Sequence, residues 1–259
     1  PLSEPTAMCL ITFQWQPDAE QRLILTANRD EFFKRPTRPL QQWQTHLGVF
    51  AGQDVSKGGS WLGIHHNGRF AALTNHRDLT IKAPENPSSR GHLVVDFLTS
   101  QQAPLAYLKE LETKAQEFDG YNLIVADTQH LAYYSNRSGE PPRILKPGLY
   151  GLSNALLDSP WPKLKSAKHT LATWLQTPKH QQPTLAGLLS STDIAKDNEL
   201  PETGIGLIME RMLSCEKIIT PHYGTRCSTG LIMGTAEIKI EEITWQEDGQ
   251  EASHNKFIL

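Results

Sequence analysis

The grouping of short apolar runs into hairpins is the feature that most constrains the fold of this chain. Five runs rich in apolar or β-branched residues occupy the first third of the sequence: 8–15, 22–27, 47–51, 61–64 and 70–74. Pro17-Asp18 provides turn residues between the first two runs, and Asn67-Gly68 is a strong hairpin turn before the last. The first third therefore predicts a five-stranded β region.

The rest of the chain mixes helices with further strands. Apolar residues at helical spacing predict helices at 88–98, with Ser88 and Ser89 as N-caps, and at 103–116, 163–175 and 185–189. Strands are predicted at 121–126, 131–135, 150–154, 228–233, 238–245 and 256–259. Residues 193–206 are rich in turn-forming and charged residues, which indicates a mobile loop.

Strands that come in hairpins and helices that come in pairs do not match the strict alternation of a doubly wound parallel sheet. We therefore expect an α+β fold in which two antiparallel sheets pack face to face and helices cover the outside, a four-layer αββα sandwich. No Ser/Gly linker or run of like charge divides the 259 residues. We expect one domain over residues 8–259, with 1–7 as an N-terminal extension or a remnant of expression.

Composition excludes several classes of function. Apolar residues make up 38% of the chain and no run approaches the ~20 that a spanning helix needs, so we expect no transmembrane segment. Residues 1–7 lack the basic and apolar regions of a signal peptide, which favours the cytoplasm. The net charge is −3 with scattered Lys and Arg, so nucleic acid is a poor candidate partner, and no glycine-rich phosphate loop is present. The sequence does not indicate an oligomeric state.

Cys9 is the first candidate for chemistry, because it follows Met8 and opens the first predicted strand. If the chain began at Cys9, one residue would supply a thiol nucleophile and an α-amine whose ordinary pKa of about 7.7 to 8.0 suits a general base. The alternative is that Cys9 is a small core residue, the commonest fate of a free cysteine.

Asn28, Arg29, Asp30 and Glu31 follow the second predicted strand, and we expect them to form a polar turn. In a hairpin, this turn would lie near the start of the first strand, where Asp30 could orient an amine and Arg29 could lower the pKa of a thiol. The alternative is a solvated turn whose charges pair with neighbouring basic residues.

Asn75 and Asn154 each end a predicted strand, where an asparagine amide could stabilise an oxyanion or simply form a turn. Arg226 could hold a carboxylate or bias the neighbouring thiol of Cys227, although a surface ion pair is equally compatible with its position.

Metal and cofactor signals are weak. His65 and His66 are adjacent, and neighbours on a strand point to opposite faces, so we expect no metal site. No Cys-x-x-Cys or Cys-x-x-Cys-His motif is present, and we expect no required cofactor. Noncovalent contact with haem stays open, because His, Cys and Tyr ligands are available.

With these residues assembled, the sequence resembles the NRDE family of proteins similar to transport and Golgi organisation protein 2. The likeness runs from Met8 to Leu259 and is carried by six ordered motifs at 23–32, 59–64, 71–75, 121–124, 150–155 and 223–226. That family is similar in turn to the N-terminal-nucleophile (Ntn) hydrolases, αββα sandwich enzymes that include penicillin V acylase and bile salt hydrolase. In the acylases an Arg stands three residues before the Asp, whereas Ala27 occupies that place here.

The resemblance implies site residues and two functions. It implies Cys9 as nucleophile, Asp30 as the group that orients its amine, Asn75 and Asn154 as oxyanion donors, and Arg226 as electrostatic support. Asn28, Arg29, Glu31, Trp61 and His76 are the expected binding residues. One expected function is cleavage of an amide or thioester of a lipophilic acyl substrate through Cys9. The other is non-catalytic haem or lipid trafficking in the same cleft, because the family is linked to haem handling and lipid metabolism.

Overall fold

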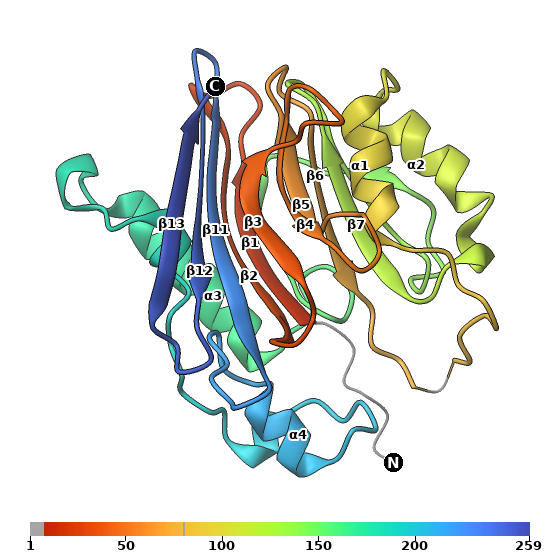
Figure 1. Ribbon diagram of the computed structural model, residues 1–259, viewed down its shortest axis with the longest axis vertical. Coiled ribbons are helices and arrows are strands. Elements are labelled where there is room, and N and C mark those ends of the chain that lie inside the picture. The colour runs from red at the N-terminus through yellow and green to blue at the C-terminus, as the bar shows by residue number, and fades with distance from the viewer. Residues whose placement is uncertain (1–7, 80) are drawn as a thin grey trace.

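The computed structural model describes residues 8–79 and 81–259, and the expected extension at 1–7 lies outside them. Two antiparallel sheets face each other (Figure 1). The six-stranded sheet runs in the order β10 (Gly148–Leu152), β1 (Met8–Trp15), β2 (Gln21–Phe32), β11 (Tyr223–Gly234), β12 (Ile238–Trp245) and β13 (Glu251–Ile258). The seven-stranded sheet runs in the order β3 (Thr37–Gln42), β4 (Val49–Asp54), β5 (Leu62–His65), β6 (Phe70–Asn75), β7 (Tyr121–Ala126), β8 (Leu131–Ser135) and β9 (Arg143–Ile144).

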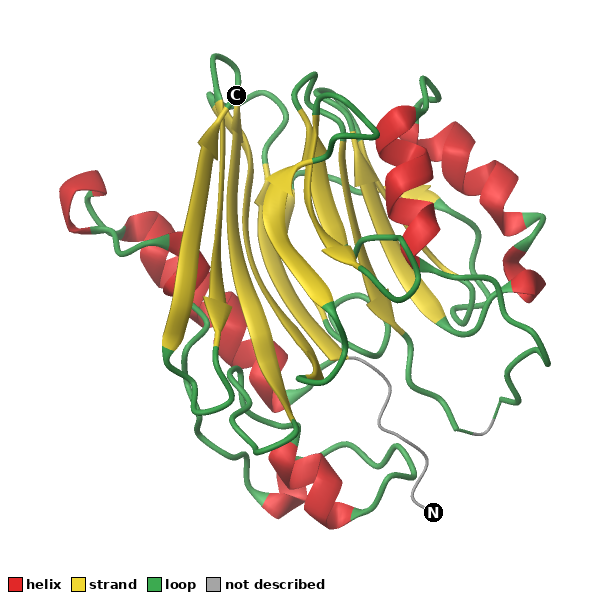
Figure 2. Cartoon of the chain, viewed as in Figure 1, coloured by secondary structure: helices red, strands yellow, loops and turns green. Residues whose placement is uncertain are grey.

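Helices cover the outer faces of both sheets (Figure 2). α1 (Gly91–Thr99) and α2 (Pro104–Glu112) pack on the seven-stranded sheet, and α3 (Pro162–Gln176) packs on the six-stranded sheet. A short helix, α4 (Leu207–Met212), lies at one end of the sandwich. The expected α+β class and the four-layer αββα arrangement are confirmed.

Apolar residues on both faces of the central strands explain the layers. In β1, Phe13 points between the sheets and joins a cluster that includes Ile64 and Phe70 of the opposite sheet, whereas Leu10 points outward to Leu164 of α3. Because these strands are covered on both faces, their sequences are nearly continuous runs of apolar residues. Because side chains alternate along a strand, Cys9 points to the same inner face as Phe13.

The tetrapeptide at 28–31 corrects the expected turn, since it forms the last part of β2 rather than a loop. β2 lies between β1 and β11, and its register with β1 pairs Leu10 with Asn28, Cys9 with Arg29, and Met8 with Asp30. Thr225 and Ser228 of β11 and the backbone carbonyls of Leu189 and Glu216 supply hydrogen-bond partners for Asn28 and Asp30, and these distant partners cannot be identified from the local sequence. Asn28 and Asp30 therefore point outward, and Arg29 and Glu31 point between the sheets.

Other boundaries also differ from expectation. The expected helix 185–189 is only a 3₁₀ turn (Leu185–Gly187), because Thr26 and Glu241 bind its polar groups and fix it against the sheet. The helix expected at 103–116 ends at Glu112, and a 3₁₀ turn (Ala115–Glu117) follows. Ser88 and Ser89 do not cap α1, which begins one residue after Arg90, and they line a cavity instead.

Three elements escaped the sequence patterns. β3 contains Pro39, which lowers strand propensity but is tolerated because β3 is an edge strand with a register shift. β9 has only two residues and α4 only six, too few for a periodic signal. The expected loop at 193–206 contains a further 3₁₀ turn (Asp197–Glu199), and another lies at Lys179–Gln181. Within the described residues, no helix has the length and apolar character needed to span a membrane.

Candidate functional site

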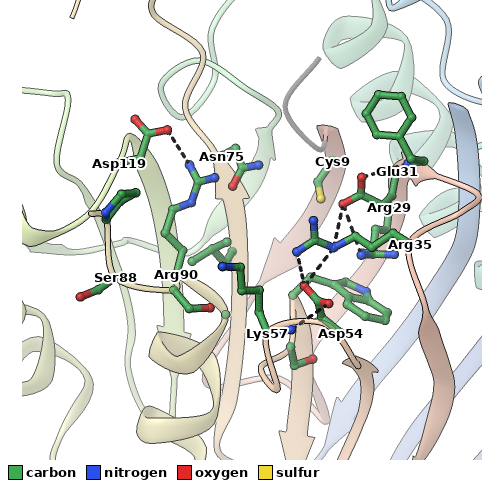
Figure 3. A pocket seen from close by; sticks show the side chains of 17 residues that line it. Cys9, Arg29, Glu31, Arg35, Asp54, Lys57, Asn75, Ser88, Arg90 and Asp119 are labelled. Atoms are coloured by element: carbon green, nitrogen blue, oxygen red, sulfur yellow. Dashed lines mark hydrogen bonds and ion pairs between the residues drawn. The ribbon is translucent and has the colours of Figure 1, made fainter. Parts of the chain in front are cut away.

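A cavity of about 390 Å³ opens between the sheets where β1 starts, β2 and β6 end, and α1 begins. Its lining is mixed but mostly polar, and seventeen residues contribute: Cys9, Arg29, Glu31, Phe32, Arg35, Asp54, Lys57, Ser60, Trp61, Leu73, Asn75, Pro87, Ser88, Ser89, Arg90, Gly91 and Asp119. Its volume falls in the range of small-molecule sites. Figure 3 shows Cys9 between one wall carrying Arg35, Glu31 and Asp54 and another carrying Asn75 and Arg90.

Cys9 lies at the inner end of this cavity, near the start of β1. Its side chain is only 7% exposed. Burial raises the pKa of the Cys9 thiol to about 12, and the carboxylate of Asp30 adds to this, whereas the guanidinium of Arg29 opposes it. The thiol is therefore protonated at neutral pH in this chain, and a nucleophilic role requires a nearby base.

Arg29, Glu31, Arg35 and Asp54 form a chain of ion pairs along one wall. Glu31 lies 3.6 Å from Arg29 and 3.5 Å from Arg35, and Arg35 makes a 2.6 Å contact with Asp54. The guanidinium of Arg29 also lies 4.3 Å from the centre of the Trp61 ring. These contacts fix the charged side chains and hold Arg29 and Trp61 against the cavity.

Asp30 lies on the other face of β2, outside the cavity but beside the backbone of the first strand. It is 1% exposed, and its backbone lies opposite Met8, the residue that precedes Cys9. Thr225 donates a 2.7 Å hydrogen bond to Oδ1, whereas Oδ2 has no partner among the described residues. Burial raises the pKa of Asp30 to about 6, opposed chiefly by the ammonium group of Lys163.

The two asparagines lie together, although only one reaches the cavity. Asn75 ends β6 and lines the cavity, whereas Asn154 is completely buried behind it. The amide of Asn154 donates a 2.8 Å hydrogen bond to the backbone carbonyl of Asn75, and the neighbouring Ser153 hydroxyl donates one to the carbonyl of Cys9. Residues 153 and 154 therefore tie the ends of β1 and β6 together.

Three other expected site residues do not line the cavity. Arg226 donates hydrogen bonds to the carbonyls of Phe32, Phe33 and Arg35, so it supports the segment that carries Arg35. Asn28 points outward and binds backbone carbonyls beneath α3. His76 follows β6, and burial lowers its pKa.

The adjacent histidines, His65 and His66, do not point to opposite faces of a strand as expected. β5 ends at His65, so His66 belongs to the following turn, and the two rings lie side by side with centroids 4.4 Å apart. Opposite strand faces therefore do not separate them. Across the described ranges, no group of three His, Cys, Asp or Glu side chains is arranged to hold a metal ion.

Sequence reasoning missed several charged residues of the cavity, namely Arg35, Asp54, Lys57, Arg90 and Asp119. They come from loops and strand ends far apart in the chain, and single charged residues in loops carry no distinctive pattern. Arg90 illustrates this, because it precedes α1 and donates a 2.6 Å hydrogen bond to the carbonyl of Gly120 across the site.

Comparisons with known proteins place the chain in a family. The sequence model described as Transport and Golgi organisation 2 matches residues 8–247. The chain belongs to this family. Transport and Golgi organization protein 2 homologs from Bos taurus and Homo sapiens are each 36% identical to it, over 87% of this chain and 88% of the relative. The Drosophila melanogaster protein is 29% identical over 62% of each chain.

Two solved structures are similar to the chain at low identity. A Caenorhabditis elegans N-acylethanolamine-hydrolyzing acid amidase ortholog matches with a TM-score of 0.45 and 11% identity, over 86% of this chain and 92% of that one. A mutant conjugated bile acid hydrolase from Clostridium perfringens matches with a TM-score of 0.44 and 10% identity, over 97% and 92%.

Proposed function

We propose that this protein is a cysteine hydrolase that cleaves an amide or thioester of a small acyl compound when its chain begins at Cys9. One observation carries the proposal: Cys9 lines the cavity, and Asp30, which is buried with one carboxylate oxygen unused, lies opposite Met8, the residue that precedes Cys9. A carboxylate with an unused oxygen at that place can accept a hydrogen bond from the amine and orient it.

The reaction would proceed in two steps. The α-amine takes the thiol proton, and the sulfur attacks the acyl carbon while the side chain of Asn75 donates a hydrogen bond to the developing oxyanion. The ammonium returns the proton to the departing amine or thiol, which leaves an acyl group on Cys9. Water then attacks this thioester with the amine as base, and the acid is released with the thiol restored.

The lining indicates how a substrate would lie. Phe32, Trp61 and Leu73 provide apolar surface for an acyl chain near Cys9. Charged side chains occupy the two walls and include Lys57, Arg90 and Asp119. We therefore favour an acyl compound that carries a polar group, rather than a purely apolar one.

The test compares a chain that begins at Cys9 with its Cys9→Ala variant and with a chain that retains Met8. Acyl thioesters of N-acetylcysteamine and matching p-nitroanilides serve as substrates. We expect turnover and an acyl adduct in the intact mass only for the chain beginning at Cys9. Equal turnover in the Cys9→Ala variant, or no adduct in any chain with the whole substrate panel, would contradict the proposal.

A second candidate is binding of haem in the same cavity. Among the lining residues, Cys9 alone is of a type that ligates haem iron, and cationic side chains stand on both walls, where they could meet the propionates. Titration of haem into the wild-type protein and the Cys9→Ala variant tests this. A Soret shift that disappears in the variant would support binding through Cys9, and an unchanged spectrum in both would exclude it.

A further inference from the structure

Lys163 is a buried lysine in an unfavourable position. It occupies the first turn of α3 and is 4% exposed, and its Nζ atom has no hydrogen-bond partner among the described residues. The N-terminus of a helix carries partial positive charge, so an ammonium group there is disfavoured twice, by burial and by the helix dipole. Residues kept at such a cost commonly serve a site.

The surroundings of Lys163 connect it to the start of β1. Leu164, the next residue, belongs to the same buried cluster as Leu10, the residue after Cys9. Lys163 and Asp30 influence each other's pKa, and Lys163 also opposes the rise in the pKa of the Cys9 thiol. A lysine Nζ atom and an aspartate Oδ2 atom, both buried and both without a hydrogen-bond partner among the described residues, thus lie on the α3 side of the sheet where β1 starts.

We propose that Lys163 is a positioning residue that, together with Asp30, holds the Cys9 α-amine in its neutral, proton-accepting form. This rests on the proposed function, because it concerns a chain that begins at Cys9. Asp30 alone would stabilise the ammonium form and so hinder proton transfer from the thiol. A second positive charge beside the amine reverses this preference, while it keeps Asp30 ionised as the hydrogen-bond acceptor.

Other charges that face Lys163 or Asp30 leave this balance in place. Arg77 adds positive charge near Lys163 and is paired with Glu210 at 3.1 Å. The remaining groups that act on Lys163 or Asp30 are the Cys9 and Cys215 thiols and the Arg29–Glu31 pair. Arg77 and Arg29 each have a carboxylate partner in these ion pairs, so Asp30 is the counter-charge of Lys163 on this side of the strand.

The experiment measures the α-amine directly. In chains that begin at Cys9 and carry ¹⁵N-cysteine, the α-amine ¹⁵N shift is followed against pH for wild type, Lys163→Met, Lys163→Arg and the exposed control Lys165→Met. We expect a wild-type pKa below the ordinary value of about 7.7 to 8.0 and a rise of about one unit or more in Lys163→Met alone. The acid limb of Cys9 alkylation by iodoacetamide should move with it.

Thermal unfolding shows whether the variants are folded. Lys163→Met leaves the buried carboxylate of Asp30 without its nearby cation, so we expect a lower melting temperature than in the wild type, and the titrations are compared only where both proteins are folded. A Lys163→Met titration curve that superimposes on that of Lys165→Met refutes the inference. Should the variant fail to fold, a wild-type amine pKa at or above the ordinary value refutes it equally well.

The titration needs no substrate, so the two proposals fail separately. A shifted amine in a chain that turns over nothing would refute the hydrolase and leave the electrostatic role of Lys163 standing. Turnover in a chain whose α-amine has an ordinary pKa would support the hydrolase and refute the role of Lys163.

Discussion

Replacement of Asn28 by alanine should destabilise the fold strongly without altering the chemistry of the cavity. Asn28 is 1% exposed, and its amide donates 2.8 Å hydrogen bonds to the carbonyls of Leu189 and Glu216. Its oxygen accepts a 2.6 Å hydrogen bond from the hydroxyl of Ser228. One side chain thus joins β2 to β11 and to two segments that cover the sheet.

The expected decrease in the free energy of unfolding follows from the polar groups that would lose their partner in Asn28→Ala. Two carbonyls and one hydroxyl would lose their partner, and each buried polar group left unsatisfied costs about 1–3 kcal/mol. The hydroxyl of Ser228 still accepts a hydrogen bond from Trp245, which limits part of this loss. We expect Asn28→Ala to lower the free energy of unfolding by about 3–5 kcal/mol.

Urea unfolding followed by tryptophan fluorescence measures this change, since the chain has six tryptophans. Asn198→Ala, at an exposed position, should stay within about 0.5 kcal/mol of the wild type. The rate of Cys9 alkylation in the folded Asn28→Ala protein should match the wild type. A decrease of less than about 1 kcal/mol in the free energy of unfolding would refute this structural role of Asn28. A changed rate of Cys9 alkylation in a variant as stable as the wild type would refute it as well.

Three further outcomes follow from the same structure. Burial raises the pKa of Asp30 from 3.8 to about 6, so its stabilising contribution is full below pH ~4 and is lost as the pH rises through ~6. In the wild-type 259-residue chain, the free energy of unfolding in urea should therefore fall by up to about 3 kcal/mol between pH 4 and 7. This fall should be absent in Asp30→Asn. Arg226→Gln removes a donor to three carbonyls after β2 and should speed hydrogen exchange there, with Arg226→Lys intermediate. Gly59→Ala would place a methyl group 2.4 Å from the carbonyl carbon of Gly91, and we expect a loss of about 1–3 kcal/mol in thermal unfolding.

Much of the sheet framework could be predicted because its signals are local. The strands at 121–126, 131–135 and 238–245 have the predicted boundaries, since apolar periodicity and flanking turn residues coincide there. Asn67-Gly68 does form the loop between β5 and β6, where Gly68 has a φ of +89° that other residues rarely adopt.

The tetrapeptide at 28–31 shows where local reasoning fails. Four polar residues in succession favour a turn, yet they form a buried strand because partners arrive from residues such as Thr225 and Ser228, almost 200 positions away. Alternation along that strand then divides the motif, with Arg29 and Glu31 at the cavity and Asn28 and Asp30 in the opposite layer.

The sequence alone determined the layer architecture, the likeness to the family and the importance of Cys9 with the tetrapeptide, because these depend on periodicity and on short ordered motifs. Only the tertiary structure decided which side chains meet. Strand register placed Asp30 opposite Met8, next to Cys9, and the packing of α3 buried Lys163 on the same side of the sheet. Such meetings depend on the pairing of distant strands and on burial, and a linear pattern of residues contains neither.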